Sequence, residues 1–308
     1  MRIFLTGAAG FIGSHLLRDL LARGHQVATL LRSPDGSASI SDLLPATTVI
    51  HGALGDWDAI SPPVHAFRPD TVIHCAWDGV AGAARNDPRQ LLNFDQATGL
   101  VALAAAAGAG AWIGLGSQAE YGPDHTARPK EDGPAQPATL YGAIKLSVCH
   151  STSILARQAG MRFAWLRVFS TYGGGDSPHW MIPSLILGLL RGEKPALTPG
   201  EQLWDYLHVS DAAAAIRHVA ETPECGGLYN LGSGRAVTLR QAVEAVRDQI
   251  SPSLPLGFGE VPYRPDQVMH LEADISRLEA AGWHPTVDFQ AGVAETVAWY
   301  RHRRHLFT

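Results

Sequence analysis

A glycine-rich turn directly after the first apolar run places the strongest constraint on the fold of this chain. Residues 2–6 form the apolar run, the turn reads Gly7-Ala8-Ala9-Gly10-Phe11-Ile12-Gly13, and helical spacing of apolar residues continues to Arg23. Glycines let the backbone turn sharply and approach a pyrophosphate, whose charge then lies at the N-terminus of the helix. A strand, this turn and a helix therefore predict a dinucleotide site, with a purely structural turn as the alternative.

The rest of the chain predicts an α/β fold with two unequal parts. Short β-rich runs alternate with long helical segments up to Tyr172, which implies a Rossmann-type doubly wound parallel sheet with right-handed crossovers. Glycine and proline punctuate the pattern afterwards and predict a smaller C-terminal α+β lobe. We expect a dinucleotide-binding domain at 1–172, to which the chain returns around 203–232, and a mainly substrate-binding lobe at 173–308. The expected strands are 26–31, 47–51, 71–76, 112–115 and 162–168. The expected helices are 88–108, 140–160, 210–222, one that begins at Thr238, and 290–304. We expect the helix at 210–222 to start with its serine, and the one at Thr238 to start with a capping box that includes Gln241.

Composition and charge limit the partners. A net charge of -5 and a pI near 6.3 give no attraction for phosphate backbones or anionic lipids, so nucleic acid and membrane are not expected. The longest apolar stretch, 100–115, is broken by Gly108 and Gly110 and is typical of a buried helix followed by a strand. Three cysteines without ligand-like spacing, and a strand that starts at once, predict a cytoplasmic protein. Fourteen scattered histidines predict no metal site.

The end of the second predicted strand distinguishes the two nicotinamide cofactors. An acidic residue at this position would hold the ribose 2'-hydroxyl of NAD, but the chain has Leu30-Leu31-Arg32-Ser33. Arg32 can pair with a 2'-phosphate and Ser33 can add a hydrogen bond. NADP(H) is therefore favoured over NAD(H), with an ordinary exposed arginine at a strand end as the alternative.

A tyrosine and a lysine provide the expected acid-base chemistry. Tyr141 and Lys145 are four residues apart on a predicted helix and so share a face, and Ser117 follows a strand at the sheet edge where ligands bind. A phenol has a reference pKa of about 10 and needs help to act at neutral pH. We expect the lysine ammonium to lower the phenol pKa, by about three units or about 4 kcal/mol, while Ser117 hydrogen-bonds the reacting oxygen. A surface tyrosine beside an unrelated lysine is the alternative.

Together these motifs resemble the extended short-chain dehydrogenase/reductases of the NAD-dependent epimerase/dehydratase type, closest to nucleotide-sugar 4-ketoreductases and epimerases. The resemblance continues through 72–76 (VIHCA), 116–122 (GSQAEYG), 167–173 (RVFSTYG), 204–211 (WDYLHVSD) and 229–234 (YNLGSG). It implies that Ser117, Tyr141 and Lys145 are the acid-base trio. It implies a cofactor site in which the pyrophosphate is lined by Gly7, Gly10, Phe11, Ile12 and Gly13. The nicotinamide-side ribose would then be flanked by Ala76 and Trp77, and the adenine would lie at Ala53 and Leu54. It also implies a homodimer that pairs through the helices predicted at 88–108 and 140–160.

The resemblance also narrows the reaction. Dehydratases of this family carry an Asp-Glu pair after the catalytic hydroxyl, whereas Gln118 and Ala119 occupy those positions here, and neither can donate or accept a proton as an acid or base. Glu120 is displaced by one position and, at an alternating strand end, should point elsewhere. We therefore expect reduction of a keto group, at C4, on a nucleoside-diphosphate-6-deoxysugar. An epimerase that retains its cofactor and a non-catalytic NADPH-binding regulator are the rivals.

Four residues are expected at the substrate. They are Gln118, Ser170, Trp204 and Arg264. Arg264 matches the family's second diphosphate-binding arginine. Trp204 replaces the arginine that relatives place before the aspartate of an RDF or RDY stretch, and Ser170 replaces an asparagine near the end of the sixth strand. Ala53 likewise replaces the acidic residue that reads the adenine amino group.

Overall fold

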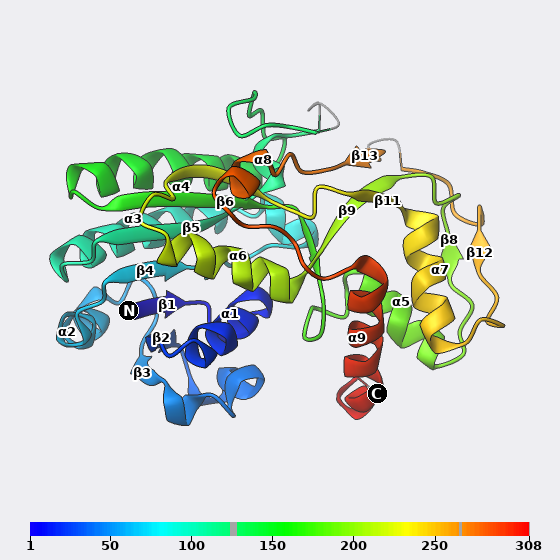
Figure 1. Cartoon of the computed structure of the whole chain (residues 1–308), viewed down its shortest axis with the longest axis horizontal. Helices are drawn as coiled ribbons and strands as arrows, with labels where there is room; N and C mark the ends of the chain where they lie inside the picture. The colour runs from blue at the N-terminus through cyan, green and yellow to red at the C-terminus, as the bar shows by residue number, and fades with distance from the viewer. Residues whose placement is uncertain (124–127, 265–266, 308) are drawn as a thin grey trace.

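A computed structural model of the chain describes residues 1–123, 128–264 and 267–307, without the side chains of 34–36. A sheet flanked by helices occupies one side of the molecule, and a smaller lobe that contains α5, α7 and α9 occupies the other (Figure 1). No helix among these residues is both long and apolar enough to cross a bilayer.

The central sheet has seven parallel strands in the order β10-β6-β5-β4-β1-β2-β3. Its strands are β1 (Arg2–Thr6), β2 (Gln26–Leu31), β3 (Thr48–His51), β4 (Thr71–His74), β5 (Ala111–Ser117), β6 (Arg162–Val168) and β10 (Gly227–Leu231). This order confirms the predicted doubly wound sheet, in which helical crossovers connect parallel neighbours.

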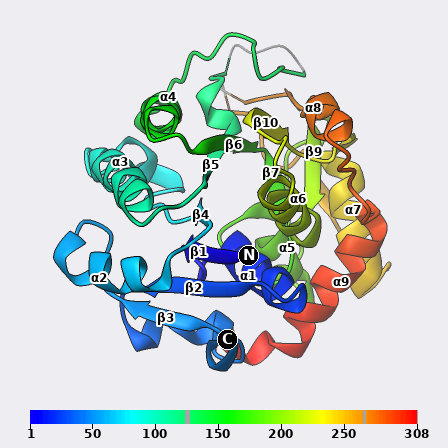
Figure 2. The same ribbon diagram turned by 60° about the vertical axis from the view of Figure 1, so that its left-hand side comes forward.

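Helices cover both faces of this sheet (Figure 2). They are α1 (Phe11–Ala22) and α6 (Val209–Glu221) on one face, and α2 (Trp57–Phe67), α3 (Gln90–Ala106) and α4 (Leu140–Gln158) on the other. The alternation of a strand explains the two cores, because Ile3 and Leu5 pack toward α1 and α6 while Phe4 packs toward α2 and α3. Since both faces are buried, only the strand ends are open to a ligand.

The smaller lobe combines two short sheets with helices around a separate apolar core. β9 (Leu203–His208) pairs with β7 (Ser170–Tyr172), β11 (Ala236–Thr238) and β13 (His270–Leu271), and β8 (Ala196–Leu197) pairs with β12 (Gly257–Phe258). The lobe helices are α5 (Met181–Leu190), α7 (Leu239–Ile250) and α9 (Phe289–His302), whereas α8 (Ser276–Ala280) packs against β10 and buries Leu278 in a core of the large sheet. The capping box that Thr238 and Gln241 form at the start of α7 is as predicted.

The chain crosses back to the large sheet after β9. The return predicted around 203–232 corresponds to α6 and β10, whereas β9 itself belongs to the lobe. The predicted serine start of α6 is wrong, because the helix begins at Val209 with His208 as its N-cap. The Ser210 hydroxyl instead lies 2.7 Å from Nδ1 of His208. A short polar side chain can satisfy either partner, and the tertiary position of His208 decides between them.

Candidate active site

The predicted site residues gather at the carboxyl edge of the central sheet. Gly7 follows β1, Ala76 follows β4 by two residues, and Ser117 is the last residue of β5. The strands are parallel, so their carboxyl ends meet at one edge, and loops far apart in the sequence come together there.

The glycine turn brings the backbones of β1, α1 and the β4 loop into close contact. Gly7 has φ +76°, and a Cβ there would lie 2.5 Å from the backbone nitrogen of Ala76. A Cβ on Gly13 would lie 2.0 Å from the Gly7 oxygen. Gly10 is the N-cap of α1, has no side-chain cap, and no acidic residue stands in the first turn. The N-terminal amides of α1 are therefore available to a phosphate, and the half-buried Phe11 and Ile12 begin the helix.

Arg32 and Ser33 are exposed at the end of β2, as an adenosine-binding role requires. Nη1 of Arg32 lies 3.7 Å from Oδ2 of Asp78, and both side chains are about three-quarters exposed. An ion pair this open to solvent contributes little, so the guanidinium can exchange it for a phosphate. Ala53 and Leu54 follow β3 by two and three residues, with Leu54 packed on the adjacent core.

Two buried amides, which the sequence analysis missed, hold the loop after β4. The Gln90 side chain accepts from Nε1 of Trp77 at 3.0 Å and donates to the Gly79 oxygen at 2.7 Å. The Asn93 side chain accepts from the Asp78 amide and donates to the Asp78 oxygen. Polar residues on the buried face of an otherwise apolar helix were the available signal. They fix Trp77 where the nicotinamide-side ribose is expected.

Tyr141, Ser117 and Lys145 lie together at this edge, and all three are buried. The first turn of α4 carries Tyr141, whose phenol lies close enough to the Ser117 side chain for that side chain to lower the phenol pKa. One helical turn later, Nζ of Lys145 donates to the Leu115 oxygen at 2.6 Å and lies 3.6 Å from the ring centroid of Trp77. The Trp77 ring meets the Tyr141 ring edge-on at 6.0 Å. The trio predicted from spacing is thus one contiguous cluster.

The sequence analysis predicted that the pKa of the Tyr141 phenol is lowered, and for the protein without bound ligands this prediction is wrong. Burial raises the pKa of Tyr141, against the opposing effects of the Ser117 hydrogen bond and the nearby Arg85 charge. Burial also lowers the pKa of Lys145 to about 7, although Glu120 and Cys75 oppose that shift. The lysine therefore carries only part of a charge near neutral pH, and desolvation is the largest effect on the phenol pKa.

Glu120 lies beneath the trio rather than in it. Ser117 caps the 3-10 helix η4 (Gln118–Glu120), and the Glu120 carboxylate accepts from the Ser117 amide at 2.9 Å. It also accepts from Nε1 of Trp165 at 3.0 Å and from Nε of Arg167 at 2.8 Å. Glu120 does point away from the reacting groups, but a 3-10 turn and a buried ion pair cause this, not the predicted strand alternation.

Arg85 and Asn86 are further neighbours of Tyr141 that the sequence did not single out. Both belong to the 3-10 helix η3 (Gly82–Asn86). Cζ of Arg85 lies 4.9 Å from the centroid of the Tyr141 ring, and the Asn86 side chain accepts from the Leu140 amide at 3.0 Å. No periodicity connects η3 with α4, so only tertiary packing brings these residues to the phenol.

The four expected substrate residues lie at three places in the fold. Gln118 is half-buried beside Ser117, while Nε1 of Trp204 donates to Oγ of Ser170, which joins β9 to β7. Arg264 is exposed on the loop that leads into β13, where Leu271 is the register partner of Trp204.

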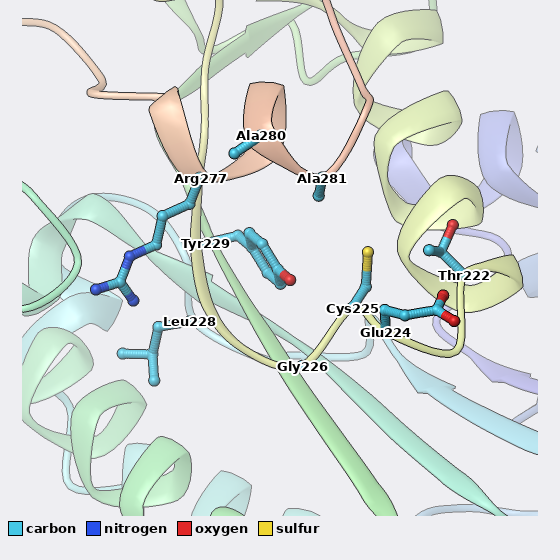
Figure 3. A pocket seen from close by; sticks show the side chains of 9 residues that line it. All are labelled: Thr222, Glu224, Cys225, Gly226, Leu228, Tyr229, Arg277, Ala280 and Ala281. Carbon is cyan, nitrogen blue, oxygen red and sulfur yellow. The ribbon is translucent and has the colours of Figure 1, made fainter.

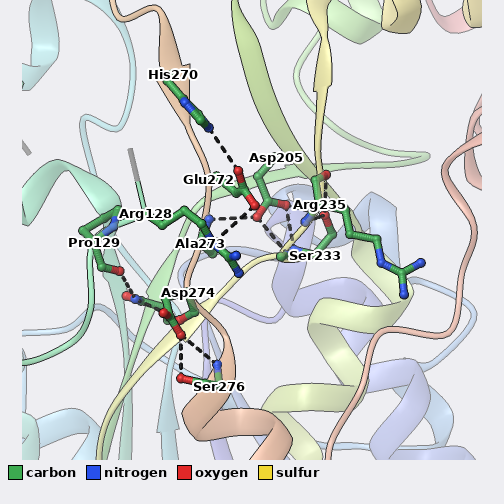
Figure 4. Close-up of polar contacts among 12 residues, drawn as sticks. Arg128, Pro129, Asp205, Ser233, Arg235, His270, Glu272, Ala273, Asp274 and Ser276 are labelled. Atoms are coloured by element: carbon green, nitrogen blue, oxygen red, sulfur yellow. Dashed lines mark hydrogen bonds and ion pairs between the residues drawn. The ribbon is translucent and has the colours of Figure 1, made fainter. Parts of the chain in front are cut away.

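Asp205 anchors the strand that presents Trp204 (Figure 4). Its buried carboxylate accepts from the Ser233 amide and hydroxyl, from the Gly234 amide and from the Ala273 amide. These bonds tie β9 to the turn after β10 and to the segment after β13. The aspartate is therefore structural, and it fixes Trp204 and Ser170 relative to the sheet edge.

Known proteins resemble this chain over nearly its whole length. The sequence model of the NAD dependent epimerase/dehydratase family matches residues 3–232. The chain belongs to this family. A UDP-glucose 4-epimerase of Azospirillum brasilense is 28% identical over 97% of this chain and 92% of that protein. A dTDP-glucose 4,6-dehydratase of Streptomyces niveus is 27% identical over 99% and 94%. The crystal structure of a Thermus thermophilus UDP-glucose 4-epimerase in complex with NAD superposes with a TM-score of 0.85 at 28% identity, covering 98% of this chain and 99% of that one.

Membership of the NAD dependent epimerase/dehydratase family makes the chain an enzyme of this class and confirms the predicted resemblance, and the two relatives named above act on nucleotide sugars. Among the described residues, the two positions after the Ser117 hydroxyl do not carry the acidic pair that the sequence analysis expects of a dehydratase. Gln118 and Ala119 follow the Ser117 hydroxyl in η4, and the nearby Glu120 carboxylate is fully occupied by an arginine, an indole and a backbone amide. In the part of the chain that the structure describes, no three histidine, cysteine or acidic side chains gather as metal ligands.

A surface hollow of about 530 Å³ lies away from the candidate active site (Figure 3). Cys225, Tyr229 and Arg277 contribute to its lining. It surrounds the start of β10, where Gly227 pairs with Ala164, whereas Ser117 pairs with Val168 at the end of β6. The hollow is therefore at the amino edge of the sheet and takes no part in the chemistry at the carboxyl edge.

Proposed function

We propose that this enzyme uses NADP(H) to reduce a keto group, at C4, of a nucleoside-diphosphate-6-deoxysugar, with Tyr141 as the proton donor. One observation supports the proposal above all others. The Tyr141 phenol, next to the Ser117 side chain and one helical turn from Lys145, lies at the same sheet edge as the glycine turn. A general acid must stand beside a hydride donor to reduce a ketone, and this fold brings the two positions together.

The residues present fit a dinucleotide. The close approach of Gly7 to Ala76 and the uncapped start of α1 leave backbone amides for the pyrophosphate. Trp77 and Ala76 would flank the nicotinamide-side ribose, while Ala53 and Leu54 would border the adenine. Arg32, with Ser33, would pair with a 2'-phosphate. When bound, the cofactor supplies the hydride that the keto carbon accepts.

The protein's own groups supply the proton. Tyr141 donates its hydroxyl proton to the keto oxygen as that oxygen gains charge, and Ser117 donates a hydrogen bond that holds the oxygen in place. The resulting phenolate is stabilised by the positive charge of Lys145, whose Nζ is already fixed by the Leu115 oxygen. A pKa of about 7 lets Lys145 return a proton readily at neutral pH.

The direction of net reaction depends on the cofactor. Arg32 in place of an acidic residue favours NADPH, which is consumed as a reductant and then released. Epimerisation with a retained cofactor is the second candidate, and the resemblance to UDP-glucose 4-epimerases supports it. The retained Tyr141, Lys145 and Ser117 argue against a regulator without catalytic activity.

The two reactions differ in stoichiometry. Purified enzyme would be given a panel of 4-keto nucleotide sugars and nucleotide sugars, with NADPH or NADH, while cofactor oxidation and products are followed. A reductase consumes one cofactor per product, whereas an epimerase interconverts isomers with no net consumption. Epimers formed without consumption of added NADPH would refute the reductase proposal.

Two variants test the assigned residues. Tyr141→Phe should abolish turnover while cofactor still binds, and Tyr229→Phe, at the amino edge, is its control. Arg32→Ala should lower the preference for NADPH over NADH by about 10- to 100-fold, because a charge-assisted phosphate contact is lost. Arg18→Ala removes another exposed arginine and should leave that preference unchanged.

We also propose a homodimer through α3 and α4. Both helices run from the carboxyl to the amino edge of the sheet, so they are parallel and pack side by side. Leu91 and Leu92, each 55% exposed, lie in the first turn of α3, and the exposed Ile154 and Leu155 lie in the last turns of α4. A two-fold axis across the helices would place the leucines of one protomer against the apolar end of its partner.

A further inference from the structure

We propose that Arg85 is the permanently charged partner of Tyr141, a positioning residue that holds the phenol and favours release of its proton. The inference deepens the proposed function, since it rests on Tyr141 as the acid-base group. The guanidinium carbon lies 4.9 Å from the centre of the Tyr141 ring. Its Nε is buried and has no hydrogen-bond partner among the described residues.

The position of Arg85 is enforced from two directions. On one side, the Asn86 side chain accepts from the Leu140 amide at the start of α4. On the other, Nε2 of Gln90 donates to the Ala84 oxygen at 2.9 Å. The 3-10 helix η3 is thus attached to both α3 and α4, and Arg85 reaches the phenol from a backbone that is fixed immediately before and after it.

The unpartnered Nε shows that Arg85 does not adopt the conformation of lowest free energy available to an arginine side chain. A buried donor without an acceptor costs free energy, and a half-buried arginine could turn its guanidinium fully into water. Arg85 instead keeps its charge against an aromatic ring, where a cation is attracted to the π face. A free-energy cost of this kind is typical of functional positions, because packing alone would favour a neutral side chain here.

A second cation is needed because of how the charges are arranged around Tyr141. Ser117 and Arg85 lower the phenol pKa, while burial, the larger effect, and the Glu120 charge raise it. Burial brings the pKa of Lys145 to about 7, with Glu120 and Cys75 facing it, and its charge also acts on the buried imidazole of His74. A guanidinium stays charged at every physiological pH. Arg85 therefore provides positive charge at the phenol even where Lys145 has lost its proton.

The direct test follows the titration of residue 141 alone. Difluorotyrosine, whose phenol is intrinsically more acidic, is incorporated in place of Tyr141, and fluorine NMR records its titration in otherwise intact protein. The same label is placed in Arg85→Met, Arg85→Lys and Arg89→Met. Arg89 is an exposed neighbour paired with Asp87 and serves as the matched control.

Loss of the cation should raise the titration midpoint. Arg85→Met should raise it by about half to one pH unit, since a half-buried charge near 5 Å acts through a dielectric between those of water and protein. Arg85→Lys should recover part of the shift, because the charge stays but the planar stacking is lost. Arg89→Met should leave the midpoint unchanged. A midpoint in Arg85→Met equal to that of the unmodified sequence would overturn the proposal, and Arg85→Gln replaces the methionine variant if the latter does not fold.

Kinetics give a second readout with a defined sign. Reduction needs the protonated phenol, so in Arg85→Met the fall in kcat at high pH should move to higher pH by the same amount. The reverse oxidation, or epimerisation, needs the phenolate and should slow about 3- to 10-fold at pH 7. The NMR midpoint does not depend on which reaction the enzyme performs. A shifted midpoint without keto reduction would therefore refute the proposed function and leave the role of Arg85 intact.

Discussion

Replacing Glu120 with glutamine changes one buried charge and keeps the shape of the side chain. The Glu120 carboxylate and the Arg167 guanidinium are 0% and 3% exposed, and the pair is only 2.8 Å apart. Removing one partner of a buried ion pair leaves the other charge uncompensated, which costs about 3–5 kcal/mol. The glutamine oxygen can still accept from the Ser117 amide and Trp165, but its NH₂ group then faces the Nε donor of Arg167. We expect Glu120→Gln to lose about 3–5 kcal/mol of unfolding free energy.

The measurement is urea unfolding followed by circular dichroism and tryptophan fluorescence. Glu193→Gln is the control, because Glu193 pairs with Arg191 on the surface, where both side chains are roughly half exposed. It should change the unfolding free energy by less than about 0.5 kcal/mol. The double variant Glu120→Leu with Arg167→Met should regain part of the lost stability, since both charges are then gone.

An activity effect accompanies the loss of stability. The Glu120 charge raises the pKa of Lys145 against the larger effect of burial, so its removal should lower that pKa below about 7 and leave less ammonium at neutral pH. Turnover at pH 7 should fall in the folded variant. A stability loss below about 1 kcal/mol would refute the reasoning, because it would mean that Arg167 finds water or another acceptor in place of the carboxylate.

Two further predictions concern stability and assembly. Burial raises the pKa of Asp176 to about 7, so the folded state holds a proton that the unfolded state releases above about pH 4, and stability should fall as pH rises from 4 to 7. This decrease in unfolding free energy, up to about 4 kcal/mol, should be absent in Asp176→Asn. The control Asp248→Asn, at an exposed aspartate, should show the same decrease as the parent. If urea unfolding gives identical pH profiles for Asp176→Asn and the parent, the assignment is wrong. Leu92→Glu should convert dimer to monomer in size-exclusion chromatography with light scattering, and Leu306→Glu, at another exposed leucine, should not; a dimer that survives Leu92→Glu would rule out the α3 and α4 interface.

The sequence by itself determined the features that depend on local order. The strand, glycine turn and helix at the start, the helical spacing of Tyr141 and Lys145, and the alternation of strands and helices all follow from backbone geometry within a few residues. These patterns indicated a doubly wound sheet, and parallel strands then required the loops to meet at one edge. The family membership and the cluster of the trio agree with those predictions.

Only the tertiary structure decided how the cluster is charged and supported. Arg85 reaches Tyr141 from the 3-10 helix η3, 56 positions earlier in the sequence, and Glu120 pairs with Arg167 in a neighbouring strand. Neither pairing follows from a periodic pattern in the sequence. The pKa values of Tyr141 and Lys145 follow from desolvation, which depends on what every neighbouring element covers. Local spacing could place the phenol and the ammonium on one face, but only the packed fold shows that burial opposes the charge of both.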